Sequence, residues 1–380
     1  MGEKARGNKQ QRAFLLSKAL RYLLLWSGTW SLARFASSQP RYWGSWAEIR
    51  LTENCNSRCL TCNAWKNKST NELTLAEFDD VFKQLRELGA PNVTISGGEA
   101  LVRPDAIDII RKAKSTGFKG IMLKTNGLLL EKKAADLANC GLTHLMVSID
   151  GMHEVDNFVR GVPNHFERAT DGIRAFNKLK EEANSDVKVV IMTTLLGLNA
   201  ADVPELIKTC SDLNASWNMN LLDCNMDLFK DIDIAKLRFT SRDMIESFFV
   251  ALREQQKKYP SVAHFCNYEL DYAKNFLNGE AENPPCVNGY QGICIGANGE
   301  VYSNCFVLPS VGNLRENSLR QIIDSDLYRK RLSRMYRRQC PGCTYYWPEN
   351  VVAKHIFSHS LICGRFSAIR KAGRARRKDS

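Results

Sequence analysis

Three cysteines within a stretch of eight residues, Cys55, Cys59 and Cys62, constrain this chain more than any other feature. Their spacing, C-x3-C-x2-C, allows all three thiolates to ligate one iron–sulfur cluster, for which thiolates are suited ligands. A cubane with three protein ligands keeps one iron open, whereas a structural cluster or zinc site is usually closed by a fourth residue. The spacing therefore predicts a cluster that activates a ligand; core cysteines or part of a zinc knuckle are the alternative.

Strand-like and helix-like segments alternate around and after this motif. Expected strands cover 47–52, 92–96, 120–124, 144–149, 187–195 and 217–222, and expected helices cover 74–88, 105–115, 131–138, 166–180 and 200–213. Repeating βα units predict an α/β fold, here a partial (β/α)6 TIM-type barrel with a small C-terminal domain of a β-hairpin plus a helix. Chemistry in such barrels lies at the carboxyl ends of strands. Four polar motifs fall there: the cysteine motif, Gly97-Gly98-Glu99, Thr125-Asn126-Gly127 and Ser148-Ile149-Asp150.

The cysteine motif followed by Gly97-Gly98-Glu99 resembles the radical S-adenosylmethionine (SAM) superfamily. The resemblance implies a [4Fe–4S] cluster on Cys55, Cys59 and Cys62 that binds SAM, and a Gly-Gly-Glu segment at the SAM amino group. It also implies groups around the SAM ribose and carboxylate, which would be Asn126, Ser148, Asp150 and Arg160. Thr61 and Ala100 depart from the family pattern, which has an aromatic residue or histidine before the third cysteine and a proline after Gly-Gly-Glu.

A second group of cysteines resembles the twitch domain, a shortened SPASM domain that holds one auxiliary [4Fe–4S] cluster. The hairpin 293–305, with its turn at Asn298-Gly299, precedes a helix at 319–335 and a C-x2-C pair. The implied ligands are Cys286, Cys305, Cys340 and Cys343, with Cys294 as a substitute for Cys286. A four-cysteine zinc ribbon is the alternative. The cysteines without ligand spacing are expected to be small buried hydrophobes: Cys140, Cys210, Cys224 and Cys266.

Charge is concentrated at the two ends of the chain. The net charge is +12, of which residues 1–41 carry +7 and residues 364–380 carry +6, so the body is close to neutral. Residues 13–36 are mostly apolar and aromatic, but cations interrupt them. The uninterrupted apolar run is too short for a membrane-spanning helix. An apolar face with aromatic residues and cations is typical of an interfacial helix. A helix packed on the chain's own core or on a partner is the alternative. We expect a cytoplasmic protein with peripheral contact to an anionic membrane. The neutral body, which has no recognised RNA-binding motif, argues against nucleic acid as a partner.

Five segments summarise the expected organisation: a basic N-terminal segment (1–45), the barrel (46–222), a connecting helical region (223–285), the auxiliary cluster domain (286–346) and a basic tail (347–380).

The resemblance implies an enzyme that, with an electron from a donor such as flavodoxin or ferredoxin, cleaves SAM to a 5′-deoxyadenosyl radical. That radical abstracts hydrogen from a substrate carbon, for oxidation, rearrangement or bond formation in a biosynthetic pathway, with a membrane-associated or lipid-linked compound as one candidate substrate. Peptide modification, RNA modification and a non-catalytic iron–sulfur or zinc scaffold remain alternatives.

Overall fold

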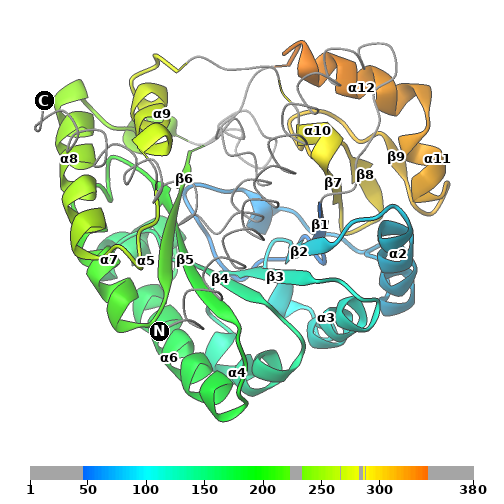
Figure 1. Ribbon diagram of the computed structural model, residues 1–380, viewed down its shortest axis with the longest axis horizontal. Helices are drawn as coiled ribbons and strands as arrows, with labels where there is room; N and C mark the ends of the chain where they lie inside the picture. The colour runs from blue at the N-terminus through cyan, green and yellow to red at the C-terminus, as the bar shows by residue number, and fades with distance from the viewer. Residues whose placement is uncertain (1–45, 223–232, 266, 282–285, 287, 341–380) are drawn as a thin grey trace, which may run out of the picture.

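A curved parallel sheet forms the centre of the computed structural model, which describes residues 46–222, 233–265, 267–281, 286 and 288–340 (Figure 1). Its first six strands follow one another in chain order, and each pairs in parallel with the next. They are β1 (Trp46–Arg50), β2 (Asn92–Ser96), β3 (Gly120–Thr125), β4 (His144–Ser148), β5 (Lys188–Leu195) and β6 (Ser216–Leu221). The predicted partial α/β barrel is confirmed.

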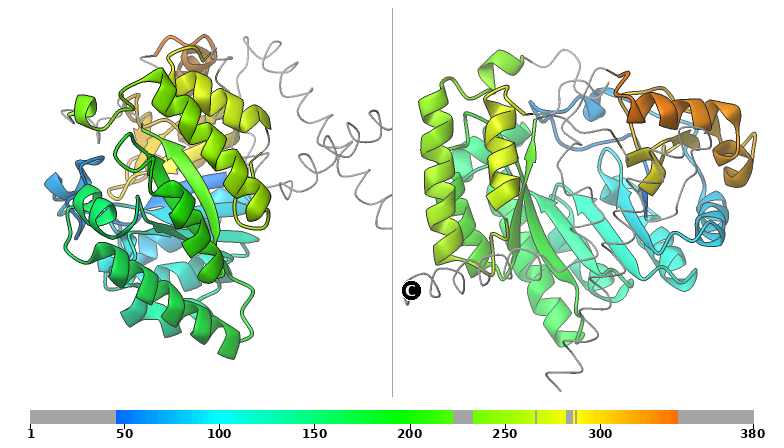
Figure 2. Two further views of the ribbon diagram at one scale, coloured as in Figure 1. Left: turned by 90° about the vertical axis from the view of Figure 1, so that its left-hand side faces the viewer. Right: turned by 45° about the horizontal axis from the view of Figure 1, so that its top comes forward.

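Helices cover the outer face of this sheet (Figures 1 and 2). They are α2 (Leu75–Glu87), α3 (Ala106–Ser115), α4 (Leu130–Asn139), α6 (His165–Glu182) and α7 (Val203–Asp212). The Thr74 hydroxyl accepts from the Glu77 amide and the Glu77 carboxylate accepts from the Thr74 amide, so a capping box begins α2. Further helices α8 (Arg242–Lys258) and α9 (Asn267–Leu277) follow the barrel, within the region predicted to be helical.

The two faces of the sheet differ in polarity because side chains alternate along each strand. On β4, Leu145 and Val147 are fully buried in the main hydrophobic core, whereas His144, Met146 and Ser148 on the other face remain partly exposed. The same alternation recurs on β5 and β6. The core therefore lies between sheet and helices, and the inner face is left partly accessible along β4 to β6, whereas the side chains of β1 are buried on both faces.

The C-terminal hairpin extends the same sheet. Strand β7 (Gly292–Ile295) pairs in parallel with β1, and β8 (Glu300–Tyr302) and β9 (Gly312–Asn313) follow as antiparallel neighbours, so one nine-stranded sheet runs from β6 to β9. The hairpin turn lies where the sequence places it, with Gly299 in a left-handed conformation at φ +88°. The short helix α10 (Asn288–Gln291) leads into β7.

One predicted helix and one predicted loop are corrected. The single helix expected over 319–335 is two helices, α11 (Leu319–Ile323) and α12 (Asp326–Tyr336), because the Ser325 hydroxyl accepts from the Tyr328 amide and starts a new helix. Between β4 and α6 the structure has a further helix, α5 (His153–Arg160), which we did not predict.

Several expectations concern residues outside the described ranges. These are the amphipathic segment 13–36, the basic tail 347–380 and the cysteines Cys224, Cys266 and Cys343. Among the helices that the structure does describe, none is both long and apolar enough to cross a membrane.

Candidate active site

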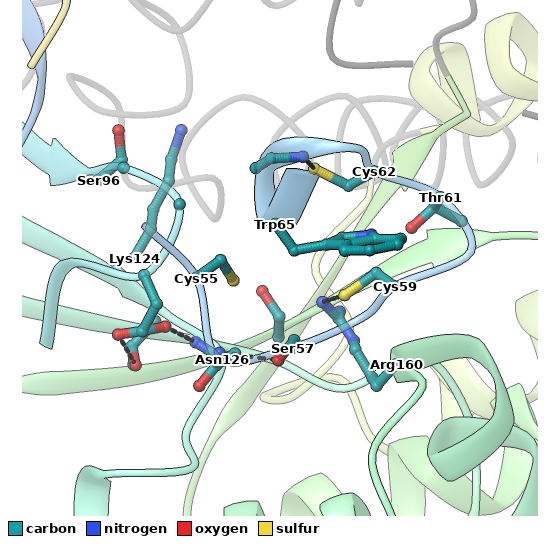
Figure 3. A pocket seen from close by; sticks show the side chains of 16 residues that line it. Cys55, Ser57, Cys59, Thr61, Cys62, Trp65, Ser96, Lys124, Asn126 and Arg160 are labelled. Carbon is teal, nitrogen blue, oxygen red and sulfur yellow. Dashed lines mark hydrogen bonds between the residues drawn. The ribbon is translucent and has the colours of Figure 1, made fainter. Parts of the chain in front are cut away.

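A pocket of about 190 Å³ opens at the carboxyl ends of strands β1 to β4 (Figure 3). It brings together all three cysteines of the first motif, the Gly-Gly-Glu segment, Asn126, Ser148 and Arg160, as the strand-end argument predicts. Its lining residues are Cys55, Ser57, Cys59, Thr61, Cys62, Ala64, Trp65, Ser96, Gly97, Gly98, Glu99, Lys124, Thr125, Asn126, Ser148 and Arg160. Asp150 is absent from this wall.

The Gly-Gly-Glu segment holds the start of the cysteine loop by backbone contacts. The Gly98 amide donates to the Thr52 carbonyl at 2.8 Å, and the Glu99 amide donates to the Asn54 carbonyl at 2.9 Å. A Cβ atom on Gly98 would lie 2.4 Å from the Asn54 carbonyl oxygen. Glycine is therefore required at position 98 for two stretches of backbone to approach each other.

The Glu99 carboxylate joins the ends of β2 and β3. Glu99 is 2% exposed. Its Oε1 accepts from the Leu101 amide at 3.0 Å and from the Thr125 hydroxyl at 2.8 Å. Its Oε2 accepts from the Asn126 amide at 2.6 Å. Burial raises the pKa of Glu99, while these three donors oppose that rise. A carboxylate oxygen can accept more than one hydrogen bond, so Oε2 retains capacity for an ammonium group.

Asn126 fastens the cysteine loop to β3. Its Nδ2 donates to Asn56 Oδ1 at 2.7 Å and to Ser57 Oγ at 2.8 Å, and its Oδ1 accepts from the Leu128 amide at 3.0 Å. Both ends of the amide are thus occupied. Asn126 orients the loop between Cys55 and Cys59, and neither Asn56 nor Ser57 stood out in the sequence.

Helix α5 holds the other side of the loop. The Arg58 amide donates to the Arg160 carbonyl at 3.1 Å, and the Leu60 amide donates to the Val159 carbonyl at 2.8 Å. Gly161 ends α5 in a left-handed conformation at φ +62°, and a Cβ atom there would lie 2.3 Å from the Arg58 carbonyl oxygen. The loop is therefore bound by the backbone on both sides.

Arg160 reaches from α5 toward the cysteines. Its Nη2 forms an ion pair with Asp150 Oδ2 at 2.8 Å, and its Nη1 lies 3.9 Å from Cys59 Sγ, within hydrogen-bond range of a sulfur. The carboxylate of Asp150 is fully buried and also accepts from the Thr194 amide at 2.7 Å. Asp150 therefore lies behind Arg160 and orients it.

Two further buried side chains support Asp150 and Arg160. Asp156 Oδ1 accepts from the Asp150 amide at 2.6 Å and lies 4.0 Å from Arg160 Nε, while Asp156 Oδ2 lies 2.6 Å from His165 Nδ1. Asp156 and His165 are both fully buried. We identified neither Asp156 nor His165 from the sequence. The four-residue spacing of Asp156 and Arg160, which places them on one face of a helix, could have indicated that Asp156 pairs with Arg160.

The first three cysteines share the pocket with Arg160. Burial raises the pKa of the Cys59 thiol to about 11, and the Arg160 guanidinium opposes that rise by stabilising the thiolate, the form that binds iron. In the part of the chain that the structure describes, no three His, Cys, Asp or Glu side chains converge closely enough for one metal ion. Ligands of a cubane bind different irons and need not converge on one point.

Trp65 lines the pocket from the short helix η1 (Ala64–Lys66), three residues beyond Cys62 (Figure 3). Its Nε1 is buried and has no hydrogen-bond partner among the described residues. Thr61 lines the same pocket, so the aromatic side chain of this loop comes from position 65 and not from position 61. The sequence analysis did not single out Trp65.

Of the second group, the structure describes Cys286, Cys294, Cys305 and Cys340. Burial raises the pKa of the Cys305 thiol, and the nearby Cys340 adds to that rise, while Cys286 is partly exposed. Cys294 is buried on β7, where its thiol donates to Asn304 Oδ1 at 3.3 Å. Away from both groups, the expected burial of Cys140 and Cys210 is confirmed.

Comparison with protein families agrees with this geometry. The profile of the radical SAM superfamily matches residues 49–210, and that of the SPASM iron–sulfur cluster-binding domain matches residues 286–344. The chain belongs to the radical SAM superfamily. It is a radical SAM enzyme whose cofactors are SAM, a SAM-binding [4Fe–4S] cluster and an auxiliary [4Fe–4S] cluster.

Relatives of this radical SAM protein carry several enzyme names. The AdoMet-dependent heme synthase of Methanosarcina barkeri is 28% identical over 78% of this chain and 87% of its own length. The Fe-coproporphyrin III synthase of the same organism is 30% identical over 41% of this chain and 38% of its own length. A probable GTP 3′,8-cyclase of Methanocaldococcus jannaschii is 30% identical over 44% of this chain. The chain spans about half of that cyclase, 55% of its length.

Solved structures share the fold. Streptococcus suis SuiB bound to its precursor peptide SuiA superposes with a TM-score of 0.61 at 16% identity, covering 81% of this chain and 71% of SuiB. At this level of identity the similarity supports the architecture alone.

Replacing Asp150 with asparagine should destabilise the protein by about 3 kcal/mol, because it removes the partner of a buried guanidinium. The matched control is Asp108→Asn on α3, whose ion pair with Arg111 is exposed and should be worth less than about 0.5 kcal/mol. Chemical denaturation of the two variants measures the difference. Equal stabilities would show that Asp150 does not hold Arg160.

Proposed function

We propose that Cys55, Cys59 and Cys62 hold the SAM-binding cluster and that the pocket they line positions SAM for hydrogen abstraction from a substrate carbon. The observation that carries this proposal is the convergence of these thiols with the Gly-Gly-Glu segment and Arg160 in one pocket. Three cysteines ligate three irons and leave the fourth open to SAM. A reduced cluster supplies the electron that cleaves the sulfonium of SAM.

The pocket offers complementary groups for the two charged ends of an amino acid. Glu99 Oε2 would accept from the SAM ammonium, and the Arg160 guanidinium would pair with the SAM carboxylate. Gly97, Gly98 and Ser148 line the same wall, where they leave room for the ligand and provide one hydroxyl. Asn126 and Asp150 would act indirectly, through the loop and through Arg160 respectively.

The auxiliary cluster would be held in the hairpin region. The proposed ligands are Cys286, Cys305, Cys340 and Cys343, and Cys294 is the substitute for Cys286. Burial of Cys294 and the bond from its thiol to Asn304 favour Cys286 as the ligand. Such a cluster would accept the electron that remains on the substrate after hydrogen abstraction, giving a net oxidation.

For the substrate, we favour an iron tetrapyrrole over a peptide. The match to the AdoMet-dependent heme synthase spans 87% of that relative, whereas the similarity to peptide-bound SuiB is one of fold. The inner face of the sheet also presents Met146 and Met192, both partly exposed, beside Lys124 in the pocket wall. Thioether side chains suit a large apolar ring. The Lys124 ammonium is already paired with Glu48 Oε2 at 2.9 Å, so the substrate assignment rests on the methionines and on the heme synthase match.

Anaerobic reconstitution and SAM turnover test the proposal. The holoenzyme should contain about eight irons and form 5′-deoxyadenosine; Cys55→Ala/Cys59→Ala/Cys62→Ala should retain about four irons and lose activity at least ~100-fold. Cys305→Ala/Cys340→Ala should also retain about four irons but still cleave SAM. Cys140→Ala is the matched control and should keep the full iron content. Zinc in place of iron, or SAM cleavage by the triple variant, would contradict the assignment.

The same assay separates substrate classes. Addition of Fe-coproporphyrin III should increase 5′-deoxyadenosine formation at least ~10-fold and consume the porphyrin. Stimulation by a peptide and not by the porphyrin would overturn the substrate assignment while leaving the SAM site intact.

Peripheral contact with a membrane in the cytoplasm also remains a proposal. It rests on the basic residues 1–41 and 364–380, which lie outside the described ranges, and each cation near an anionic surface is worth about 1 kcal/mol. A chain without these ends should bind phosphatidylserine vesicles more weakly than the full chain in co-sedimentation. Equal binding would refute the proposal.

A further inference from the structure

A cluster in the pocket must receive its electron from a protein that docks nearby, because electron transfer slows steeply with distance. The part of the surface closest to the proposed ligands is the loop that carries them. If Cys55, Cys59 and Cys62 hold the cluster, as proposed above, this loop is where the donor must approach.

The loop and the residues that follow it form a basic segment. Residues 54–69 contain three cations, Arg58, Lys66 and Lys68, and no carboxylate, and all three cations are exposed. The Arg58 guanidinium lies 5.2 Å and the Lys66 ammonium 5.3 Å from the centroid of the Trp65 ring. Trp65 itself lines the cluster pocket, so these cations gather directly outside it.

Two apolar side chains are exposed beside these cations. Leu60, between two of the proposed cluster ligands, is 37% exposed, and Phe158 on α5 is 62% exposed. The Leu60 amide donates to the carbonyl of Val159, the residue after Phe158, so the two side chains belong to neighbouring stretches of backbone. Apolar side chains with charged groups around them are typical of the surfaces on which proteins dock.

Of the two acidic side chains on α5, one is exposed near this surface. Asp156 is fully buried against His165, and exposed Glu154 lies one helical turn before Phe158. We name Arg58, Leu60, Lys66 and Phe158 the loop patch.

We propose that the loop patch is the docking surface for an acidic one-electron donor protein of the flavodoxin or ferredoxin class. One electron leaves the donor, which is oxidised by one equivalent, and enters the cluster, which is reduced by one; no bond or proton changes place. Charge complementarity favours an acidic protein, and it acts mainly on the rate of association. A second copy of this chain would bring another basic patch and be repelled.

Stopped-flow reduction of the holoenzyme by flavodoxin hydroquinone tests this docking surface. For the wild-type enzyme, the second-order rate constant should fall as salt is raised from low to physiological ionic strength. In Lys66→Glu/Lys68→Glu, which changes two exposed lysines and leaves the Arg58 bonds to the Cys55 and Ser57 carbonyls in place, the low-salt rate constant should fall at least ~10-fold, while reduction by dithionite changes less than ~2-fold. Phe158→Ser should slow reduction of the enzyme by flavodoxin and leave reduction by dithionite unchanged.

The matched control is Lys178→Glu/Lys208→Glu, which reverses two exposed cations on α6 and α7 and should leave both rates unchanged. A wild-type rate that is independent of salt would overturn the docking surface, as would an unchanged flavodoxin rate in the double variant. If reduction by dithionite slowed as much as reduction by flavodoxin, the docking surface would also be overturned, because the substitutions would then have altered the cluster itself. Failure of dithionite to reduce the wild-type enzyme at all would instead count against the proposed function.

Discussion

Backbone hydrogen bonds hold the cysteine loop between strand β2 and helix α5, and the geometry of the pocket depends on them. On one side the Gly98 and Glu99 amides donate to the residues before Cys55; on the other the Arg58 and Leu60 amides donate to the end of α5. Three thiols can ligate one cluster only when the loop that carries them has a defined shape. In this protein the chain itself supplies that shape, and glycine at positions 97 and 98 allows the backbone after β2 to approach Thr52 and Asn54.

Much of the barrel could be predicted from the sequence because its strands and helices have strong local patterns. The six strands and the position of the pocket at the strand ends are confirmed. Helix α5 was missed because its eight residues mix charged and apolar side chains without an N-cap hydrogen bond. The burial of Asp156 and His165 could not be predicted, since charged residues on a short helix are usually solvated.

The pairing of β7 with β1 is the second feature that local pattern could not reveal. These strands are far apart in the sequence, and the hairpin was expected within a small separate domain. In the structure the first strand of the iron–sulfur domain lies directly beside the strand that leads into the cysteine loop. The sheet thereby joins the strand that leads into the cysteine loop to the hairpin strand that carries Cys294, whose partner on β1 is Glu48.

We infer that protein contacts, and not the cluster, order the cysteine loop. Native-state hydrogen exchange of the cluster-free protein tests it most directly, through the amides of Arg58, Leu60, Gly98 and Glu99. We predict that all four exchange at least ~100-fold more slowly than in an unfolded chain, because each is bonded to a carbonyl before any iron binds. Exchange of the Arg58 and Leu60 amides at the unfolded rate, with protection only after cluster assembly, would contradict the account.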